Sequence, residues 1–167
     1  MAMARQLWLL RHADAEPHGT RADANRMLTE RGKRQAGVAG RAFAQAKVKF
    51  AAALSSPKAR ARETAELALA EMGDAQGGFE LHQPLAGGFR AEQALEAFAD
   101  NAAEGSLLLV GHEPDLSNVV GELTGGRVDL KKGGVAVVKL SGGGGELVLL
   151  LRPAELALIA GAVDLAV

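Results

Sequence analysis

Residues 7–14 read Leu7-Trp8-Leu9-Leu10-Arg11-His12-Ala13-Asp14, in which four large apolar side chains are followed by an arginine and a histidine. A continuous apolar run of this kind predicts a strand that is buried on both faces, and such strands occur in sheets covered by helices. Ligands of open α/β sheets bind beyond the carboxyl ends of the strands. Arg11 and His12 therefore lie where a functional site is expected.

The composition limits the kinds of chemistry that the chain can carry. Its 167 residues suffice for one domain, 1–167, with a core large enough to fold without a disulfide or a structural metal. The absence of cysteine excludes thiol nucleophiles, disulfides and thiolate metal sites, and it fits a reducing compartment.

Charge and hydropathy bear on the partners and the location of the chain. The 19 basic and 20 acidic residues give a formal net charge of -1, so no general attraction to nucleic acid or to anionic lipid is expected. No apolar run approaches the roughly 20 residues that span a bilayer, and the apolar stretch after Arg5 is too short for a signal peptide. We therefore expect a cytoplasmic protein without membrane or nucleic-acid partners, for which a monomeric state is plausible.

Strands and helices alternate along the chain. Strands are expected at 7–10, 50–54, 79–81, 107–110, 135–140 and 147–151, and helices from Thr29 through Phe43, from Lys58 to about Met72, at 91–103, at 114–123 and from Pro153. Thr29 is the expected cap of its helix, and Ser55-Ser56-Pro57 is expected to supply a serine cap and a proline at the first helical position. The pattern predicts an α/β fold, a three-layer sandwich with a mostly parallel mixed sheet between helices.

The glycine run Gly142–Gly145 lies between two expected strands. Because a strand rather than a helix follows it, the run is interpreted as the turn of a hairpin and not as a phosphate-binding loop.

Basic side chains follow three of the expected strands or lie just beyond them. Arg11 and His12 follow the first strand, Arg60 lies just beyond the second, and His112 follows the strand at 107–110. The guanidinium group offers a rigid fork of donors that matches phosphate oxygens, and the start of a helix adds positive potential. These residues predict a pocket for a compact anion such as phosphate.

The chain also resembles a known family. The segments that carry the resemblance are Leu9-Leu10-Arg11-His12-Ala13, Leu28-Thr29-Glu30-Arg31-Gly32, Ser55-Ser56-Pro57-Lys58-Ala59-Arg60-Ala61-Arg62-Glu63-Thr64 and Gly111-His112-Glu113-Pro114. They are similar, in order, to the motifs of the histidine phosphatase (phosphoglycerate mutase-like) superfamily, and the short chain looks most like its SixA-type phosphohistidine phosphatases. The resemblance implies the fold of that superfamily, a mixed sheet sandwiched between helices.

The resemblance also implies roles for individual residues. His12 would be the nucleophile that forms a covalent phosphohistidine, Arg11 and Arg60 would bind phosphate, and His112 would donate to a phosphate oxygen. Asp23 occupies a stretch that is expected to border the pocket and contact the substrate. Since phosphoryl transfer depends mainly on positioning and on charge stabilisation, no metal or cofactor is expected.

One departure from the family pattern bears on the substrate. Many relatives that hydrolyse phosphate esters carry a carboxylic acid where this chain has Pro84-Leu85-Ala86-Gly87-Gly88-Phe89, which contains none. An alkoxide needs a proton to leave, whereas imidazole leaves readily from a phosphoramidate once protonated. This favours phosphohistidine as substrate. The sequence leaves the proton donor, if any, open among Asp14, Asp23, Glu92 and Asp115.

Two further functions remain open from the sequence. The chain could be a small-molecule phosphomonoesterase with Asp14 or Asp23 as the acid, or a poorly catalytic module that binds phosphoproteins. The short connections favour an open site, which suits a phosphorylated protein better than a small phosphorylated metabolite. A metal site of His12, His112 and Asp14 is disfavoured because the flanking arginines repel a cation.

Overall fold

The computed structural model describes residues 5–73, 78–102, 104–161 and 167, and its strands form one mixed sheet. The strands are β1 (Gln6–Arg11), β2 (Ala52–Ser55), β3 (Glu80–Leu81), β4 (Ser106–Gly111), β5 (Val135–Ser141) and β6 (Gly144–Leu151), in the spatial order β3-β2-β4-β1-β5-β6. Strands β1 to β4 are parallel, β5 is antiparallel to β1, and β6 is antiparallel to β5. The expectation of a mostly parallel mixed sheet is confirmed.

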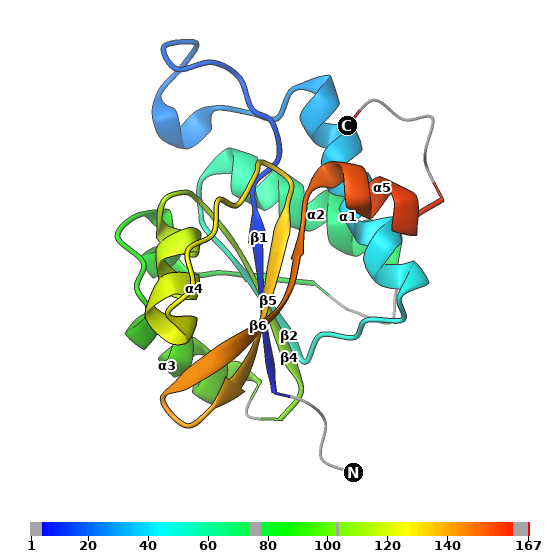
Figure 1. Ribbon diagram of the computed structural model, residues 1–167. Coiled ribbons are helices and arrows are strands. Elements are labelled where there is room, and N and C mark those ends of the chain that lie inside the picture. Colours follow the sequence, from blue (N-terminus) through cyan, green and yellow to red (C-terminus); the bar gives the residue numbers. More distant parts are fainter. Residues whose placement is uncertain (1–4, 74–77, 103, 162–166) are drawn as a thin grey trace.

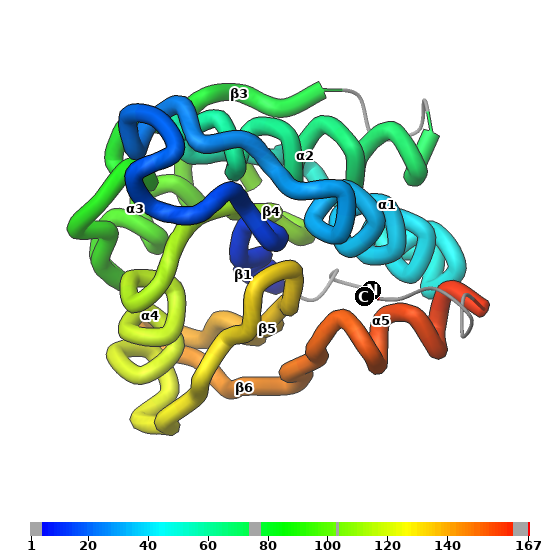
Figure 2. Tube along the Cα trace, turned by 90° about the horizontal axis from the view of Figure 1, so that it is seen from above, coloured from blue at the N-terminus to red at the C-terminus, as the bar shows by residue number. Residues whose placement is uncertain are grey.

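Helices cover both faces of the sheet, as Figures 1 and 2 show. They are α1 (Glu30–Gln45), α2 (Ala59–Met72), α3 (Ala91–Asn101), α4 (Asp115–Thr124) and α5 (Pro153–Ile159). Residues of α1, α2 and α5 pack on one face, and residues of α3 and α4 pack on the other. Within the described ranges, no helix is both long and apolar enough to cross a membrane.

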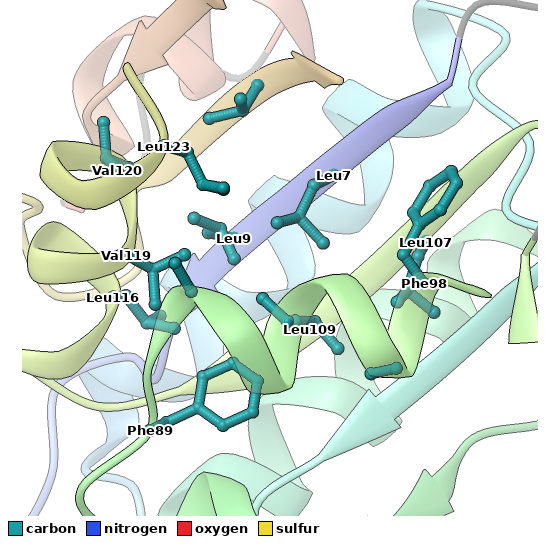
Figure 3. Close-up of a cluster of buried hydrophobic side chains, with 14 of the residues drawn as sticks. Leu7, Leu9, Phe89, Phe98, Leu107, Leu109, Leu116, Val119, Val120 and Leu123 are labelled. Atoms are coloured by element: carbon teal, nitrogen blue, oxygen red, sulfur yellow. The ribbon is translucent and has the colours of Figure 1, made fainter. Parts of the chain in front are cut away.

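The first strand divides its side chains between the two layers of the core. Leu7 and Leu9 belong to the cluster shared with α3 and α4, which Figure 3 shows, whereas Trp8 and Leu10 belong to the cluster shared with α1, α2 and α5. All four side chains are buried. The apolar run at 7–10 thus has the two-sided burial expected of a strand in a sheet covered by helices.

Helix α1 begins as expected and packs closely on α2. The hydroxyl oxygen of Thr29 accepts a hydrogen bond from the Gly32 amide at 3.0 Å, so Thr29 is the cap. Farther along α1, a Cβ atom added to Gly40 would lie 2.1 Å from the Ala68 carbonyl oxygen. Glycine therefore permits an approach of the two helices that no other residue would allow.

The expected start of α2 and the expected hairpin tip need correction. Lys58 is extended, with ψ 136°, so α2 begins at Ala59 and Pro57 lies outside its first turn. Ser56 Oγ accepts a bond from the Lys58 amide at 3.2 Å instead of capping the helix. Gly144 pairs with Ser141 as the first residue of β6, so only Gly142 and Gly143 form the turn. Residue 103 and most of the expected apolar tail, 162–166, lie outside the described residues.

Candidate active site

A cavity of about 230 Å³ opens beyond the carboxyl ends of β1 and β4. We call it the strand-end cavity; it is lined by Arg11, His12, Ala15, Glu16, Pro17, His18, Arg26, Arg60, His112, Glu113 and Lys132. The structure thus brings together the two arginines and two histidines that the sequence places beyond three strands. Figure 1 shows the long loop after β1 at this end of the sheet. The cavity is smaller than the roughly 300–1,000 Å³ of drug-sized ligand sites, and its size suits a compact group.

The backbone around His12 is fixed by hydrogen bonds from separate parts of the chain. The His12 amide donates to the Gly111 carbonyl at 2.9 Å, and the His12 carbonyl accepts from the Gly133 amide at 3.1 Å. The Ala13 amide donates to Thr64 Oγ1 at 3.1 Å. Gly133 has φ +74°, a conformation that favours glycine at this close approach. The backbone position of His12 is therefore fixed by contacts within the protein.

The protonation state of the His12 ring follows from its contacts. Nδ1 lies 2.8 Å from the Ala13 carbonyl oxygen. A carbonyl can only accept, so Nδ1 carries the proton and Nε2 keeps its lone pair. Burial lowers the pKa of His12 to about 3, and the positive charges of Arg60 and Arg11 act in the same direction, against the opposing hydrogen bond to Ala13. The ring is therefore a neutral potential nucleophile at neutral pH.

His112 lies beside His12, with their ring centroids 5.2 Å apart. Its Nε2 lies 2.7 Å from Ser56 Oγ, which also accepts from the Lys58 amide. The Ser56 hydroxyl proton is then free to donate to Nε2, which places the ring proton of His112 on Nδ1. Burial lowers the pKa of His112 to about 3, with further lowering by His12 and Arg60, so this ring is also neutral.

Three buried donors in this region have no hydrogen-bond partner. Among the residues that the structure describes, the buried side-chain polar atoms without a partner are Arg11 Nε, Arg60 Nε and His112 Nδ1. Other nitrogens of the same arginines are held in place, since Arg11 donates to the Leu130 carbonyl at 2.9 Å and Arg60 to the Asp23 carbonyl at 2.8 Å. Unpaired buried donors are costly, and all three belong to side chains that line the strand-end cavity, where the oxygens of an anion are partners of the kind that they lack.

Asp23 does not line the cavity, although it contacts Arg60. Its carboxylate lies 3.0 Å from Lys58 Nζ and 3.4 Å from an Arg60 nitrogen. The hydrogen bonds from Lys58 and Arg26 and the charge of Arg60 hold the pKa of Asp23 far below its usual range, although desolvation opposes this. Asp23 therefore stays ionised and is a poor proton donor, while its contribution to substrate binding stays a prediction.

The other three candidate proton donors also lie outside the strand-end cavity. The Asp14 carboxylate accepts bonds from Thr29 at 2.8 Å and Lys132 at 3.1 Å, and these lower its pKa although burial alone would raise it. Asp115 accepts a bond from the Phe89 amide at 3.2 Å, and Glu92 is exposed on α3.

Two carboxylates that sequence reasoning missed do line the cavity. Glu16 accepts from the Met27 amide at 2.9 Å and from Arg21, which lowers its pKa. Glu113 accepts from the Ser117 amide at 2.9 Å and from its hydroxyl group. Both carboxylates are thus engaged as acceptors. The position of Glu113 directly after His112 is a sequence signal that could have pointed to it, whereas nothing in the sequence marks Glu16.

The donor set does not suit a metal ion. Within the described part of the chain, no three His, Asp or Glu side chains are grouped so that they could hold one. Asp14 is bonded to Thr29 and Lys132, and it does not line the strand-end cavity with His12 and His112. The arginines that line the cavity further disfavour a cation.

Comparisons with known proteins identify the family of the chain. A model of the histidine phosphatase superfamily (branch 1) matches residues 7–86. A protein of Picosynechococcus sp. is 32% identical over 142 residues, which are 78% of this chain and 82% of that protein. A structure of the protein histidine phosphatase SixA with tungstate has 25% identity and a TM-score of 0.79, over 90% of this chain and 99% of that one.

Further solved structures share the fold. A SixA from Nakamurella multipartitia, described as a putative phosphohistidine phosphatase, has 28% identity and a TM-score of 0.72, over 91% of this chain and 98% of that one. An alpha-ribazole-5′-P phosphatase from Escherichia coli, also described as putative, has 20% identity and a TM-score of 0.69, over 92% of this chain and 98% of that one, and at this identity it shows the fold alone. The chain belongs to the histidine phosphatase superfamily, among its SixA-like members.

Proposed function

We propose that this phosphatase hydrolyses phosphohistidine in proteins, without a metal ion, through a covalent phosphohistidine on His12. The observation that carries the proposal is the neutral His12 ring, whose Nε2 keeps its lone pair. The ring lines the same cavity as Arg11, Arg60 and His112, each of which has a buried nitrogen without a partner. The likeness to the structure of the protein histidine phosphatase SixA supports the choice of substrate.

In the first step, Nε2 of His12 attacks phosphorus. The Nε2–P bond forms while the bond between phosphorus and the substrate imidazole breaks, and the departing imidazole takes a proton from water. Arg11, Arg60 and His112 donate to the phosphoryl oxygens and stabilise the charge that builds up on them. In the second step, an O–P bond forms as water attacks phosphorus, and the Nε2–P bond breaks with its electron pair returning to His12. The attacking water loses a proton to solvent, inorganic phosphate leaves, and the neutral His12 ring is restored.

The carboxylates around the cavity favour phosphohistidine over phosphate esters. Asp23 is held ionised by cations, and the two carboxylates that line the cavity already accept hydrogen bonds. None of these groups is arranged to protonate an alkoxide. Imidazole is a weaker base and can take its proton from solvent, so it needs no such group.

The proposed substrate predicts that the rate of hydrolysis depends on the leaving group. With a chelator present, the protein is expected to hydrolyse a phosphohistidine protein and an aryl phosphate, and to hydrolyse alkyl phosphates roughly 10²- to 10⁴-fold more slowly, because that is the usual contribution of a general acid. Steady-state kinetics on the three substrate classes checks this. Efficient hydrolysis of sugar phosphates beside inactivity on phosphohistidine proteins would instead identify a small-molecule phosphomonoesterase. Phosphate binding without turnover would identify a binding module.

Ser56 is expected to position His112, and a Ser56→Ala variant tests this. Loss of the 2.7 Å contact to Nε2 frees the ring to move its proton away from Nδ1. The kcat for an aryl phosphate is expected to fall roughly 10- to 100-fold, as for other residues that orient a functional histidine. Nitrogen NMR of the His112 ring should report the loss of the Nδ1-protonated form.

Ser55→Ala is the matched control for Ser56→Ala. Both serines are fully buried, but the Ser55 hydroxyl donates to the Ser56 carbonyl at 2.9 Å rather than to His112. The control should lose stability without a change in the His112 proton position. If both variants lose the same kcat and the His112 ring proton stays on Nδ1 in both, Ser56 has only a structural role and does not position His112.

A further inference from the structure

A groove of about 540 Å³ adjoins the strand-end cavity. We call it the basic groove because its charged lining residues are five cations and one carboxylate: Arg11, Arg31, Lys131, Lys132 and Arg152, with Asp14. The chain as a whole has a net charge of -1, so this surplus of positive charge is local. A local surplus of this kind attracts anionic partners.

The fold assembles the basic groove from distant segments at one end of the sheet. Arg31 is in the first turn of α1, Lys131 and Lys132 precede β5, and Arg152 directly precedes α5. Figure 1 shows the starts of α1 and α5 and the segment that leads into β5 at the same end of the molecule as the loop after β1. The groove therefore lies on the side where the candidate active site opens.

The present partners of these cations are easily exchanged. Arg152 lies 2.8 Å from Glu155 and is 64% exposed, and Lys132 lies 3.1 Å from Asp14 and is 46% exposed. Lys131 pairs in the same way with its neighbour Asp129. Exposed pairs of this kind are weak, because water screens the charges and both side chains are mobile. An incoming carboxylate can therefore compete for these cations.

The basic groove and the strand-end cavity share two side chains, Arg11 and Lys132, which line both. A ligand whose phosphoryl group fills the cavity can thus extend directly into the groove. Arg31 donates to an oxygen of Val167, another lining residue, at 3.2 Å, so this cation already has a partner within the chain. The continuity of the cavity and the groove fits a substrate that extends beyond its phosphoryl group.

We propose that the basic groove binds acidic side chains that flank the phosphohistidine of a protein substrate. The proposal rests on the proposed function and adds a preference for substrates with Asp or Glu near the phosphorylated residue. Because the exposed cations act on association and not on phosphorus, they should lower KM for the protein substrate and leave kcat unchanged.

A double charge reversal, Lys131→Glu with Arg152→Glu, tests the groove. Both residues lie outside the strand-end cavity, and both are exposed. For a phosphohistidine protein with acidic neighbours, KM should rise roughly tenfold or more, and the rise should shrink at high salt. The kcat/KM for an aryl phosphate should stay within about twofold. A KM for the protein substrate equal to that of the parent protein, or the same loss on both substrates, would overturn the proposal.

The matched control is Lys33→Glu with Arg41→Glu, which reverses two exposed charges on α1. These residues pair with Glu30 and Glu71 and do not line the groove. The control changes the net charge by the same amount, so an equal rise in KM would assign the effect to overall charge and contradict a groove.

Binding without turnover separates this proposal from the proposed function. A short fluorescent peptide of alternating glutamate and glycine should bind the parent protein, and a glutamine and glycine peptide of the same length should not. The double reversal should abolish binding of the acidic peptide. This result is expected even if phosphohistidine proves not to be the substrate. If the peptide fails to bind while phosphohistidine turnover is intact, the groove proposal is overturned and the proposed function is not.

Discussion

The His12→Ala variant is expected to lose turnover, with kcat at least roughly 10⁴-fold lower for both an aryl phosphate and a phosphohistidine protein. The reason is that the variant has no nitrogen to form the covalent intermediate. The remaining donors can still hold a phosphoryl group, but direct attack by water lacks a positioned nucleophile. Steady-state and single-turnover kinetics measure the loss.

The same variant should still bind phosphate, because Arg11, Arg60 and His112 remain. Calorimetry with inorganic phosphate checks this, and it separates loss of the nucleophile from loss of the fold. His82→Ala is a matched control, since the His82 ring packs on Phe89 with centroids 6.3 Å apart and does not line the strand-end cavity. Turnover by His12→Ala at the parent rate would contradict the assignment of the nucleophile.

Substitution of Arg60 is expected to have the second-largest effect. In Arg60→Ala, kcat/KM should fall roughly 10³-fold, at the lower end of what an arginine contributes to phosphoryl transfer. The side chain is buried, its terminal nitrogens contact Asp23, and its Nε has no partner, so its loss removes both a fixed charge and an unpaired donor. Arg60→Lys should recover little, because an ammonium group cannot reproduce the fork.

Arg62→Ala provides the control on the same helix. Arg62 is exposed and does not line the cavity, and residues two apart on a helix point in very different directions. Its substitution should leave kcat/KM within about twofold, since exposed surface positions usually have small effects. Similar losses at Arg60 and Arg62 would indicate a general electrostatic effect rather than a phosphate contact.

The sequence predicts the fold well where buried strands carry continuous apolar runs. Leu107 to Val110 and Leu7 to Leu10 lie side by side in β4 and β1, and each run is buried on both faces. The start of α2 was harder to predict, because local preference places Pro57 and a serine at the helix start. In the structure, Ser56 Oγ lies 2.7 Å from His112 Nε2 and does not cap the helix. The two residues are 56 positions apart, so rules based on neighbouring residues cannot predict this contact.

The sequence also predicts which residues form the site better than it predicts their protonation states. The positions of Arg11, His12, Arg60 and His112 beyond strand ends predict that they meet, and the structure brings them to one cavity. The neutral forms of the two rings depend on burial and on neighbouring positive charges, and the positions of their protons depend on single hydrogen bonds. The sequence specifies none of these. Glu16 reaches the cavity from the long loop after β1, which lies at this end of the sheet.

The basic groove, likewise, could not be predicted from the sequence. Its cations come from the first turn of α1, the segment before β5 and the start of α5. Each of these segments carries charges of both signs in the sequence, such as Glu30 with Arg31 and Asp129 with Lys131. Only the topology of the sheet brings the positive members together beside the candidate active site.

The covalent step can be observed directly by rapid quenching of the protein with a labelled aryl phosphate, followed by analysis of the peptide that contains His12. We expect acid-labile phosphate on His12, attached through Nε2 because Nδ1 is engaged with the Ala13 carbonyl at 2.8 Å. Turnover without label on His12, label on another residue, or attachment through Nδ1 would contradict the proposed chemistry.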